Sequence, residues 1–168
     1  MQHILTPDIH RQPLMQQYHF IKIHTPDEIP FGLLLLADET KEAIKKYIYR
    51  SDVYLLKNKN NEVIAVCALY QPDADPLEIK NMAVARRCQR KGIGSFLIEQ
   101  IKKIAKEQGI RTLIVGTGDG SLGQQRFYKR NGFTAYDTRK NFFIKNYPAP
   151  VIENGIPLKD MILLKQDI

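Results

Sequence analysis

A glycine-rich turn at residues 89–94 is the segment of this chain best suited to chemistry. Its residues are Gln89-Arg90-Lys91-Gly92-Ile93-Gly94, and it joins an apolar, strand-like run to a long amphipathic helical pattern. Glycine lets a ligand approach the backbone closely, and the first turn of a helix has N–H groups without intrahelical partners. The turn is therefore suited to bind an anion, and a pyrophosphate is the expected ligand.

Two common nucleotide-binding motifs do not fit this turn. A dinucleotide-binding fingerprint needs a third glycine and an acidic residue after the next strand, where this chain has Val115-Gly116-Thr117. A P-loop needs Gly-Lys-Ser/Thr at the end of the turn, which is also missing. The pattern thus disfavours dinucleotides and nucleoside triphosphates.

The elements that must position the turn follow from apolar periodicity. Residues 77–84 predict a strand that leads into it, and a helical repeat that includes Ile93, Leu97 and Ile101 predicts a helix that Gly109 ends. Asparagine-rich residues 58–61 predict a hairpin turn between two earlier strands. The other predicted elements are strands at 18–23, 53–57, 62–70, 112–115, 133–136 and 161–165, helices at 33–36, 39–49 and 121–130, and irregular chain at 141–154.

Composition restricts the class of protein. With 168 residues and 43% hydrophobic content, we expect one domain over residues 1–168, in which residues 1–17 form an irregular arm. The net charge of +7 is spread along the chain rather than gathered in one stripe, so we expect no nucleic-acid partner. A polyanionic cofactor would use the basic residues at 86–91 equally well.

Cysteine usage and hydropathy add expected absences. Cys67 and Cys88 are too few for a disulfide framework and lack metal-ligand spacing, so we expect no metal. No apolar run of ~18 residues is present, and the first ten residues lack a signal-peptide pattern. We therefore expect a cytoplasmic protein without a membrane partner.

Three segments taken together resemble the GCN5-related N-acetyltransferase (GNAT) superfamily: residues 78–84, 89–94 and 127–133. The turn fits that superfamily's Q/R-x-x-G-x-G/A signature at every position. The resemblance spans about residues 53–136 and implies an α/β fold, with a mixed, mostly antiparallel sheet of about six to seven strands flanked by helices and splayed at the cofactor site. Residues 116–124 and 141–162 resemble a bacterial branch of small acetyltransferases that is recognised by sequence rather than by substrate.

The resemblance implies acetyl-CoA as co-substrate. Backbone N–H groups of residues 89–95 would hold its pyrophosphate, and Arg90 and Lys91 would add side-chain contacts. An N–H near Met82 would polarise the thioester carbonyl. The implied cofactor-binding residues are Met82, Ala83, Val84, Gln89, Arg90, Lys91, Gly92, Ile93, Gly94 and Ser95.

The resemblance also implies two catalytic residues. Tyr128 matches the usual general acid, which would protonate the CoA thiolate as it leaves. Glu78 matches the catalytic glutamate of the histone-acetylating branch. However, Glu78 lies four residues before Met82, about 13 Å along an ideal strand at ~3.3 Å per residue, so a direct role needs a bulge in the strand and an indirect one needs a water. The alternative is a structural carboxylate paired with a lysine.

The implied function is transfer of an acetyl group from acetyl-CoA to a primary amine of a small molecule or peptide. The alternatives are a non-catalytic or regulatory acyl-CoA-binding module and a nucleic-acid-binding domain. Glu153, Asp137 and Asp160 are candidates to bind a cationic amine, although Glu153-Asn154-Gly155 also suits an ordinary turn. The oligomeric state stays open, with a homodimer as one option.

Overall fold

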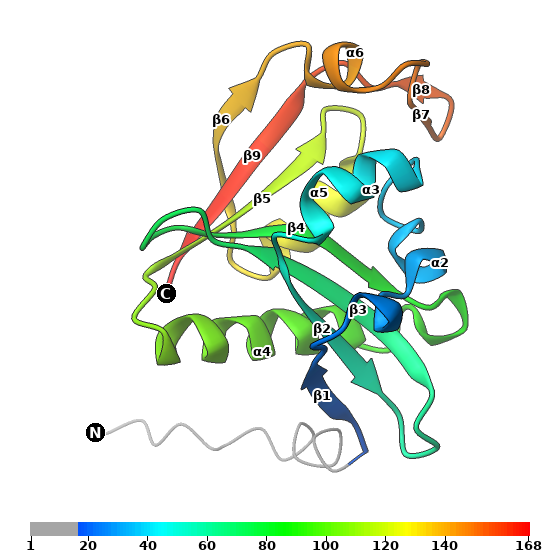
Figure 1. Cartoon of the computed structure of the whole chain (residues 1–168). Helices are drawn as coiled ribbons and strands as arrows, with labels where there is room; N and C mark the ends of the chain where they lie inside the picture. Colours follow the sequence, from blue (N-terminus) through cyan, green and yellow to red (C-terminus); the bar gives the residue numbers. More distant parts are fainter. Residues whose placement is uncertain (1–16) are drawn as a thin grey trace.

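A seven-stranded sheet forms the centre of the protein in the computed structural model, which describes residues 17–168 (Figure 1). The strand order is β1-β2-β3-β4-β5-β9-β6, and every neighbouring pair is antiparallel except β4 and β5. The strands are β1 His19–Lys22, β2 Asp52–Lys57, β3 Val63–Tyr70, β4 Leu77–Val84, β5 Thr112–Gly118, β6 Thr134–Arg139 and β9 Met161–Asp167. This topology confirms the predicted mixed, mostly antiparallel sheet.

Helices cover both faces of the sheet. The helical segments are η1 Pro26–Glu28, α2 Phe31–Leu34, α3 Lys41–Ile48, η2 Arg86–Cys88, α4 Ile93–Glu107, α5 Leu122–Arg130 and α6 Phe142–Asn146. Helices α4 and α5 pack on one face, where Ile98, Ile101 and Tyr128 share a buried cluster with Ile79. Helices α2 and α3 pack on the other, where Leu34 and Ile44 meet Val66, Ala68 and Ala83.

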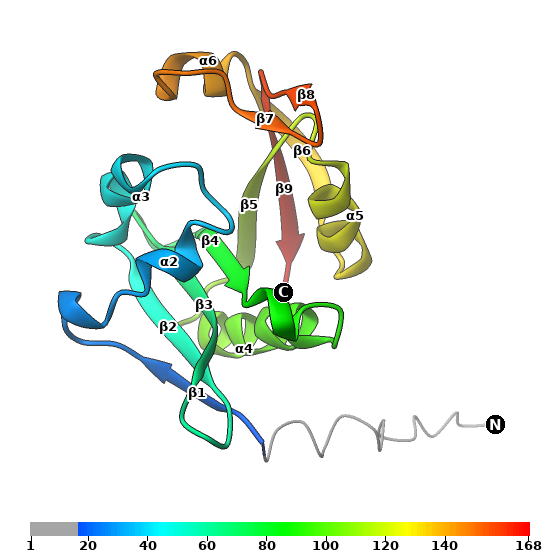
Figure 2. The same ribbon diagram turned by 90° about the vertical axis from the view of Figure 1, so that its right-hand side faces the viewer.

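Strands β4 and β5 separate after a short parallel contact. They pair only from Leu77↔Leu113 to Ile79↔Val115. Beyond this point β5 pairs with β9 alone, from Gly116↔Leu163 to Gly118↔Met161. Figure 2 shows β5, β9 and β6 turning away from β4. The predicted splay is confirmed, and it leaves one edge of residues 80–84 without a partner strand in the described part of the chain.

The structure corrects the prediction for the C-terminal third. Residues 141–154, predicted irregular, contain helix α6 and strand β7 (Ile152–Glu153), which pairs with β8 (Ile156–Pro157). Phe143, Val151 and Leu158 bury one another beneath this segment. Packing between residues that are distant in sequence therefore orders this stretch, although its prolines and aromatic residues show no helical or strand periodicity.

Strands β5 and β6 are among those that extend beyond their predicted ends. Residues 116–118 lie beyond the end of the predicted strand at 112–115, yet they extend β5 by pairing with β9. Strand β6 likewise continues to Arg139 through its pairing with β9. In both cases a neighbouring strand overrides local propensity.

Several expectations concern regions or groups beyond the sheet. The predicted arm at residues 1–17 lies, except for its last residue, outside the described residues. Within residues 17–168, no helix combines the length and apolar character needed to cross a membrane. No group of three or more potential metal ligands is found in that same range. Cys67 is fully buried in the core.

Candidate functional site

The turn between β4 and α4 is held by hydrogen bonds from its own side chains. Gln89 donates through Nε2 to the carbonyl oxygen of Val84, 2.9 Å away, and so ties the turn to the last residue of β4. Lys91 donates through Nζ to the carbonyl oxygen of Arg87 at 3.0 Å. These contacts fix the path of the backbone, and Gln89 thus acts through its side chain as well as its position.

Six consecutive backbone N–H groups in this turn have no acceptor in the part of the chain that the structure describes. The N–H groups of residues 90–95 donate no hydrogen bond to any atom of residues 17–168, and the first N–H that does is that of Phe96, to the carbonyl of Gly92. Such groups at the start of a 15-residue helix are stabilised by an anion, which accepts their hydrogen bonds and meets the positive end of the helix dipole. The turn therefore fits a pyrophosphate.

The two glycines of the turn are needed for different structural reasons. Gly92 has φ of 80°, a left-handed conformation that favours glycine. A Cβ at Gly94 would lie 3.0 Å from Cζ of Phe127, so this glycine lets α5 pack close to the start of α4. Sequence reasoning assigned ligand approach to both glycines and missed the packing role of Gly94. Arg90 also has a positive φ, 59°, which is strained for a residue with a side chain.

Strand β4 carries a bulge next to the splay. Leu69 pairs with Ile79 and Ala68 pairs with Asn81, so Lys80 has no partner on β3. After the bulge Met82 contacts the clusters on the α4 side, whereas Ala83 belongs to the α2–α3 cluster. The bulge that a direct role of Glu78 required is thus present, between Glu78 and Met82.

Tyr128 lies in the core beneath the splay. Its ring meets Phe127 and Phe133 edge-on, with centroids 5.1 and 5.4 Å away, in a cluster that also contacts Met82. Its hydroxyl forms no hydrogen bond with residues 17–168. Burial, with a smaller contribution from Cys67, raises the pKa of Tyr128 above its ordinary value, so the phenol keeps its proton at neutral pH.

Glu78 is paired with cations, as its structural alternative predicted. Its Oε1 lies 3.2 Å from Nζ of Lys80 and 4.0 Å from a guanidinium nitrogen of Arg139, and the side chain is 11% exposed. Glu78 is therefore suited to orient an ammonium or a water.

A polar network joins helix α3, Asp38 just before it, and Tyr147 at the end of helix α6. The carboxylate of Asp38 accepts hydrogen bonds from Tyr147 at 2.8 Å and from Tyr47 at 3.2 Å. Asn81 in turn donates through Nδ2 to the Tyr47 hydroxyl and to the carbonyl of Leu34, both at 3.0 Å. Burial, and then the charge of Asp38, raises the pKa of both tyrosines. Sequence reasoning found none of these residues, because they are separated by up to 109 positions.

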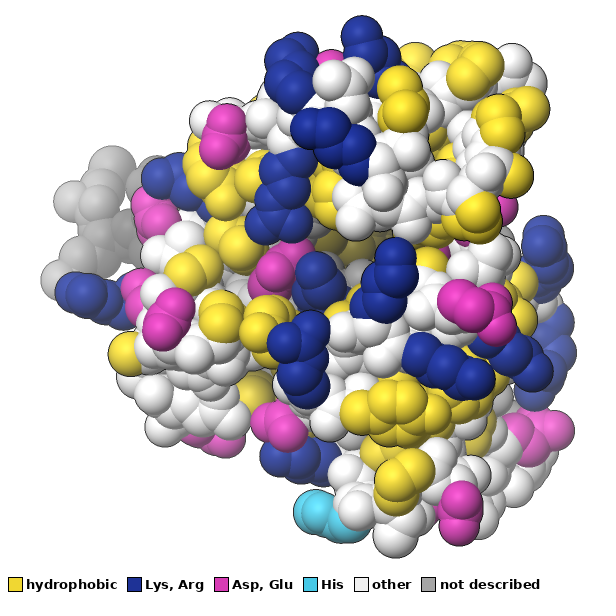
Figure 3. All heavy atoms as spheres, turned by 45° about the horizontal axis from the view of Figure 1, so that its top comes forward, with side chains coloured by type: hydrophobic (Ala, Val, Ile, Leu, Met, Phe, Trp, Pro, Cys, Tyr) yellow, Lys and Arg dark blue, Asp and Glu magenta, His cyan; other side chains and the backbone are white. Residues whose placement is uncertain are grey.

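A cavity of about 210 Å³ lies beside this network. Helix α3, strands β3 and β4 and helix α6 contribute its lining: Ala43, Lys46, Tyr47, Arg50, Tyr70, Lys80, Phe142, Asn146 and Tyr147. Figure 3 shows several Lys and Arg side chains around the hollow on this face, with an acidic group at its edge. The cavity reaches β4 at the bulge residue Lys80, where the strands begin to splay.

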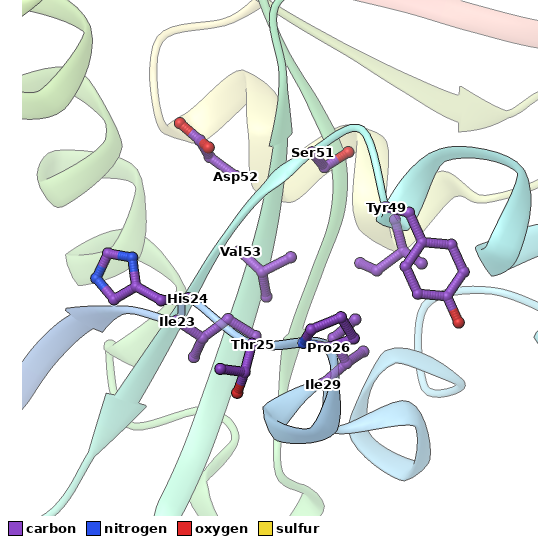
Figure 4. A pocket seen from close by; sticks show the side chains of 10 residues that line it. Ile23, His24, Thr25, Pro26, Ile29, Tyr49, Ser51, Asp52 and Val53 are labelled. Atoms are coloured by element: carbon purple, nitrogen blue, oxygen red, sulfur yellow. The ribbon is translucent and has the colours of Figure 1, made fainter.

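A second cavity, of about 150 Å³, is lined by residues of the β1–η1 connection and the α3–β2 corner. Figure 4 shows His24 and Tyr49 pointing to opposite sides and Asp52 pointing away from Thr25 and Pro26. These residues come from the β1–β2 edge, away from the β4–β5 splay. Its polar groups do not converge, so it is the weaker candidate site.

The predicted acidic candidates for an amine site have structural partners. Glu153 accepts a hydrogen bond from Ser121, and it precedes a tight turn in which Asn154 and Gly155 have positive φ values of 50° and 77°. Asp160 accepts from the backbone N–H of Asn141 and from Lys140, and these hydrogen bonds lower its pKa. Asp137 is exposed and accepts from the next backbone N–H. The turn interpretation of residues 153–155 is confirmed.

The fold and the site together define an α/β protein in which a turn suited to bind phosphate groups follows strand β4, where β4 separates from β5. Residues 19–133 match the acetyltransferase (GNAT) family, and the chain belongs to it. It is 34% identical over 144 residues to the uncharacterized N-acetyltransferase YvbK of Bacillus subtilis, a match that covers 86% of this chain and 92% of YvbK.

Solved structures agree with this family. A GNAT family acetyltransferase from Elizabethkingia anophelis with acetyl-CoA bound is 43% identical, with a TM-score of 0.85 over 90% of this chain and 99% of that one. A Bacillus subtilis acetyltransferase in complex with CoA is 32% identical, with a TM-score of 0.79 and the same coverage of both chains.

Proposed function

We propose that this protein transfers an acetyl group from acetyl-CoA to a primary amine of a small molecule or peptide. One observation carries the proposal: the six N–H groups of residues 90–95, which have no acceptor among residues 17–168, follow the open edge of β4 in the chain. The pantetheine arm of acetyl-CoA would bind at the open strand edge, and its pyrophosphate would bind at the N–H groups that follow. The acetyl-CoA and CoA found in the two solved relatives support the same assignment.

The residues present fit this co-substrate. The N–H groups of residues 90–95 would bind the pyrophosphate, and the side chains of Arg90 and Lys91, both exposed, would add positive charge. The unpaired edge that contains Met82, Ala83 and Val84 would bind the pantetheine amides, as a neighbouring strand would. Bound acetyl-CoA supplies an activated thioester.

Tyr128 would act as the general acid. In the transfer, a C–N bond forms as the C–S bond breaks, and the departing sulfur needs a proton. Burial keeps the Tyr128 phenol protonated, and it also raises the pKa of the Cys67 thiol in the same cluster. A thiolate released among these residues would be a stronger base for the same reason, so the raised pKa of Tyr128 does not by itself prevent proton transfer to the sulfur.

Glu78 would act on the amine side. A free alkylamine has a pKa of about 10.4 and is mostly protonated at neutral pH, so it must lose a proton before attack. The carboxylate of Glu78, held by Lys80 and Arg139, would bind the ammonium and pass its proton to water. A backbone N–H near Met82 would polarise the thioester carbonyl.

The test is thiol release from acetyl-CoA across a panel of primary amines, combined with calorimetric binding of CoA. An enzyme gives amine-dependent thiol release and an acetylated product of the expected mass. A non-catalytic acyl-CoA-binding module binds CoA but releases thiol with no amine in the panel. Absence of CoA binding would contradict both functions.

A further inference from the structure

The cavity between α3, β4 and α6 is lined by cations and aromatic rings. Lys46, Arg50 and Lys80 contribute three positive charges, and no carboxylate is among its lining residues. Its walls include Tyr47, Tyr70, Phe142 and Tyr147. A site for a simple cationic amine would have the opposite charge.

Arg50 is held in place but keeps free donors. One guanidinium nitrogen donates to the carbonyl oxygen of Lys46 at 2.9 Å, and the group lies over the ring of Tyr70, 5.5 Å from its centroid. Within residues 17–168, Arg50 pairs with no carboxylate, so its other N–H groups have no anionic partner there. A fixed guanidinium with available donors matches a carboxylate in two-point contact.

Lys46 and Lys80 add charge at two sides of the cavity. Lys46 donates to the carbonyl of Asn146 at 3.2 Å and pairs with no carboxylate of residues 17–168. Lys80 lies 5.7 Å from the ring centroid of Tyr47 and pairs with Glu78. The carboxylate that pairs with Lys80 at the cavity is that of Glu78, which lies on β4.

The charges are thus arranged for a molecule with both signs. We propose that the acceptor is a small α-amino acid with an apolar side chain. Its carboxylate would bind Arg50 and Lys46, its ammonium would lie toward Glu78 and the β4 edge, and its side chain would lie among the aromatic rings. A cavity of about 210 Å³ is smaller than the roughly 300–1,000 Å³ typical of drug-sized ligands, which favours an acceptor of this size. This inference rests on the proposed acetyl transfer and narrows its acceptor.

The experiment compares each of the twenty α-amino acids with its own amide and its decarboxylated amine, with acetyl-CoA saturating and thiol release as the readout. The best acceptor should be a free amino acid, with kcat/KM at least about tenfold above its amide. If amides or decarboxylated amines are the better acceptors, or if no amino acid is acetylated, the inference is wrong. Those results leave the proposed function intact when CoA binds and another amine is acetylated.

A matched pair of variants tests whether Arg50 binds the carboxylate of the amino acid. Arg50→Gln should raise KM for the best amino acid about tenfold or more while kcat/KM for its amide stays unchanged. Arg111→Gln, an exposed arginine just before β5, serves as the control and should change neither. Equal losses for acid and amide in Arg50→Gln would show a general structural role and overturn the assignment. Melting temperatures of both variants verify folding.

Discussion

The two halves of the proposed site, one for the co-substrate and one for the acceptor, are built from different groups. The cofactor half uses backbone N–H groups from one continuous segment, residues 90–95, and the open edge of one strand. The acceptor half uses side chains from α3, β4 and α6, which the Asp38 network joins. Backbone groups can bind the same co-substrate whatever the side chains are, whereas the acceptor half can change its specificity by substitution.

Tyr128 lies in the core cluster that Met82 of strand β4 contacts, and its replacement should have the largest effect. Tyr128→Phe removes the proton donor but keeps the ring contacts with Phe127 and Phe133. We expect kcat to fall about 10²–10⁴-fold, the usual contribution of general acid–base catalysis, with the Kd of CoA unchanged. Steady-state kinetics and calorimetry measure the two quantities. Normal turnover would remove Tyr128 from the mechanism.

Asp38 tests whether the acceptor half can be disrupted alone. Asp38→Ala leaves the hydroxyls of Tyr47 and Tyr147 without their acceptor, and hydrogen bonds to a charged group contribute about 1.5–3 kcal/mol each. We expect a lower free energy of unfolding and a higher KM for the amine, with KM for acetyl-CoA unchanged. Asp27→Ala, at an exposed position, is the control. If Asp38→Ala weakens acetyl-CoA instead, the two halves are not independent.

Gly92 tests the cofactor half alone, and Gly109 is its matched control. Both glycines have positive φ, 80° and 75°, and neither would meet an atom within 4 Å through an added Cβ. Alanine at either position should therefore cost a similar free energy of unfolding, about 1–2 kcal/mol. Only Gly92→Ala should raise KM for acetyl-CoA, by about tenfold. Equal KM values in the two variants would show that the turn does not bind the co-substrate.

The smallest effect appears only at alkaline pH. Tyr47, Tyr128 and Tyr147 have pKa values raised by burial, so the folded protein holds these protons more tightly than the unfolded chain. Their contribution to stability is fully present below pH of about 10, the unfolded pKa, and is lost as pH rises above it. Urea unfolding between pH 8 and 11.5 should show this decline, and Tyr147→Phe should make it shallower. A flat profile would contradict the burial of these phenols.

The same contrast explains what could be predicted from sequence. The turn, β4 and α4 were predicted because their signals are local: glycines, apolar periodicity and a helix end. The separation of β4 from β5 came only from the resemblance. The proposed acceptor cavity was missed because Asp38, Tyr47 and Tyr147 carry no shared spacing and meet only in the fold. Glu153 and Asp160 were predicted as candidates for amine binding from their charge alone, but in the structure they accept hydrogen bonds from Ser121 and from the backbone of Asn141.

The most direct test of the cofactor half is to observe the backbone N–H groups themselves. In ¹⁵N-labelled protein, adding CoA should shift the amide resonances of residues 90–95 strongly, because these N–H groups would gain an anionic acceptor. Pantetheine, which lacks the pyrophosphate, should leave them nearly unchanged while shifting residues 82–84. Unmoved resonances of residues 90–95 at saturating CoA would contradict the assignment of this turn as the pyrophosphate site.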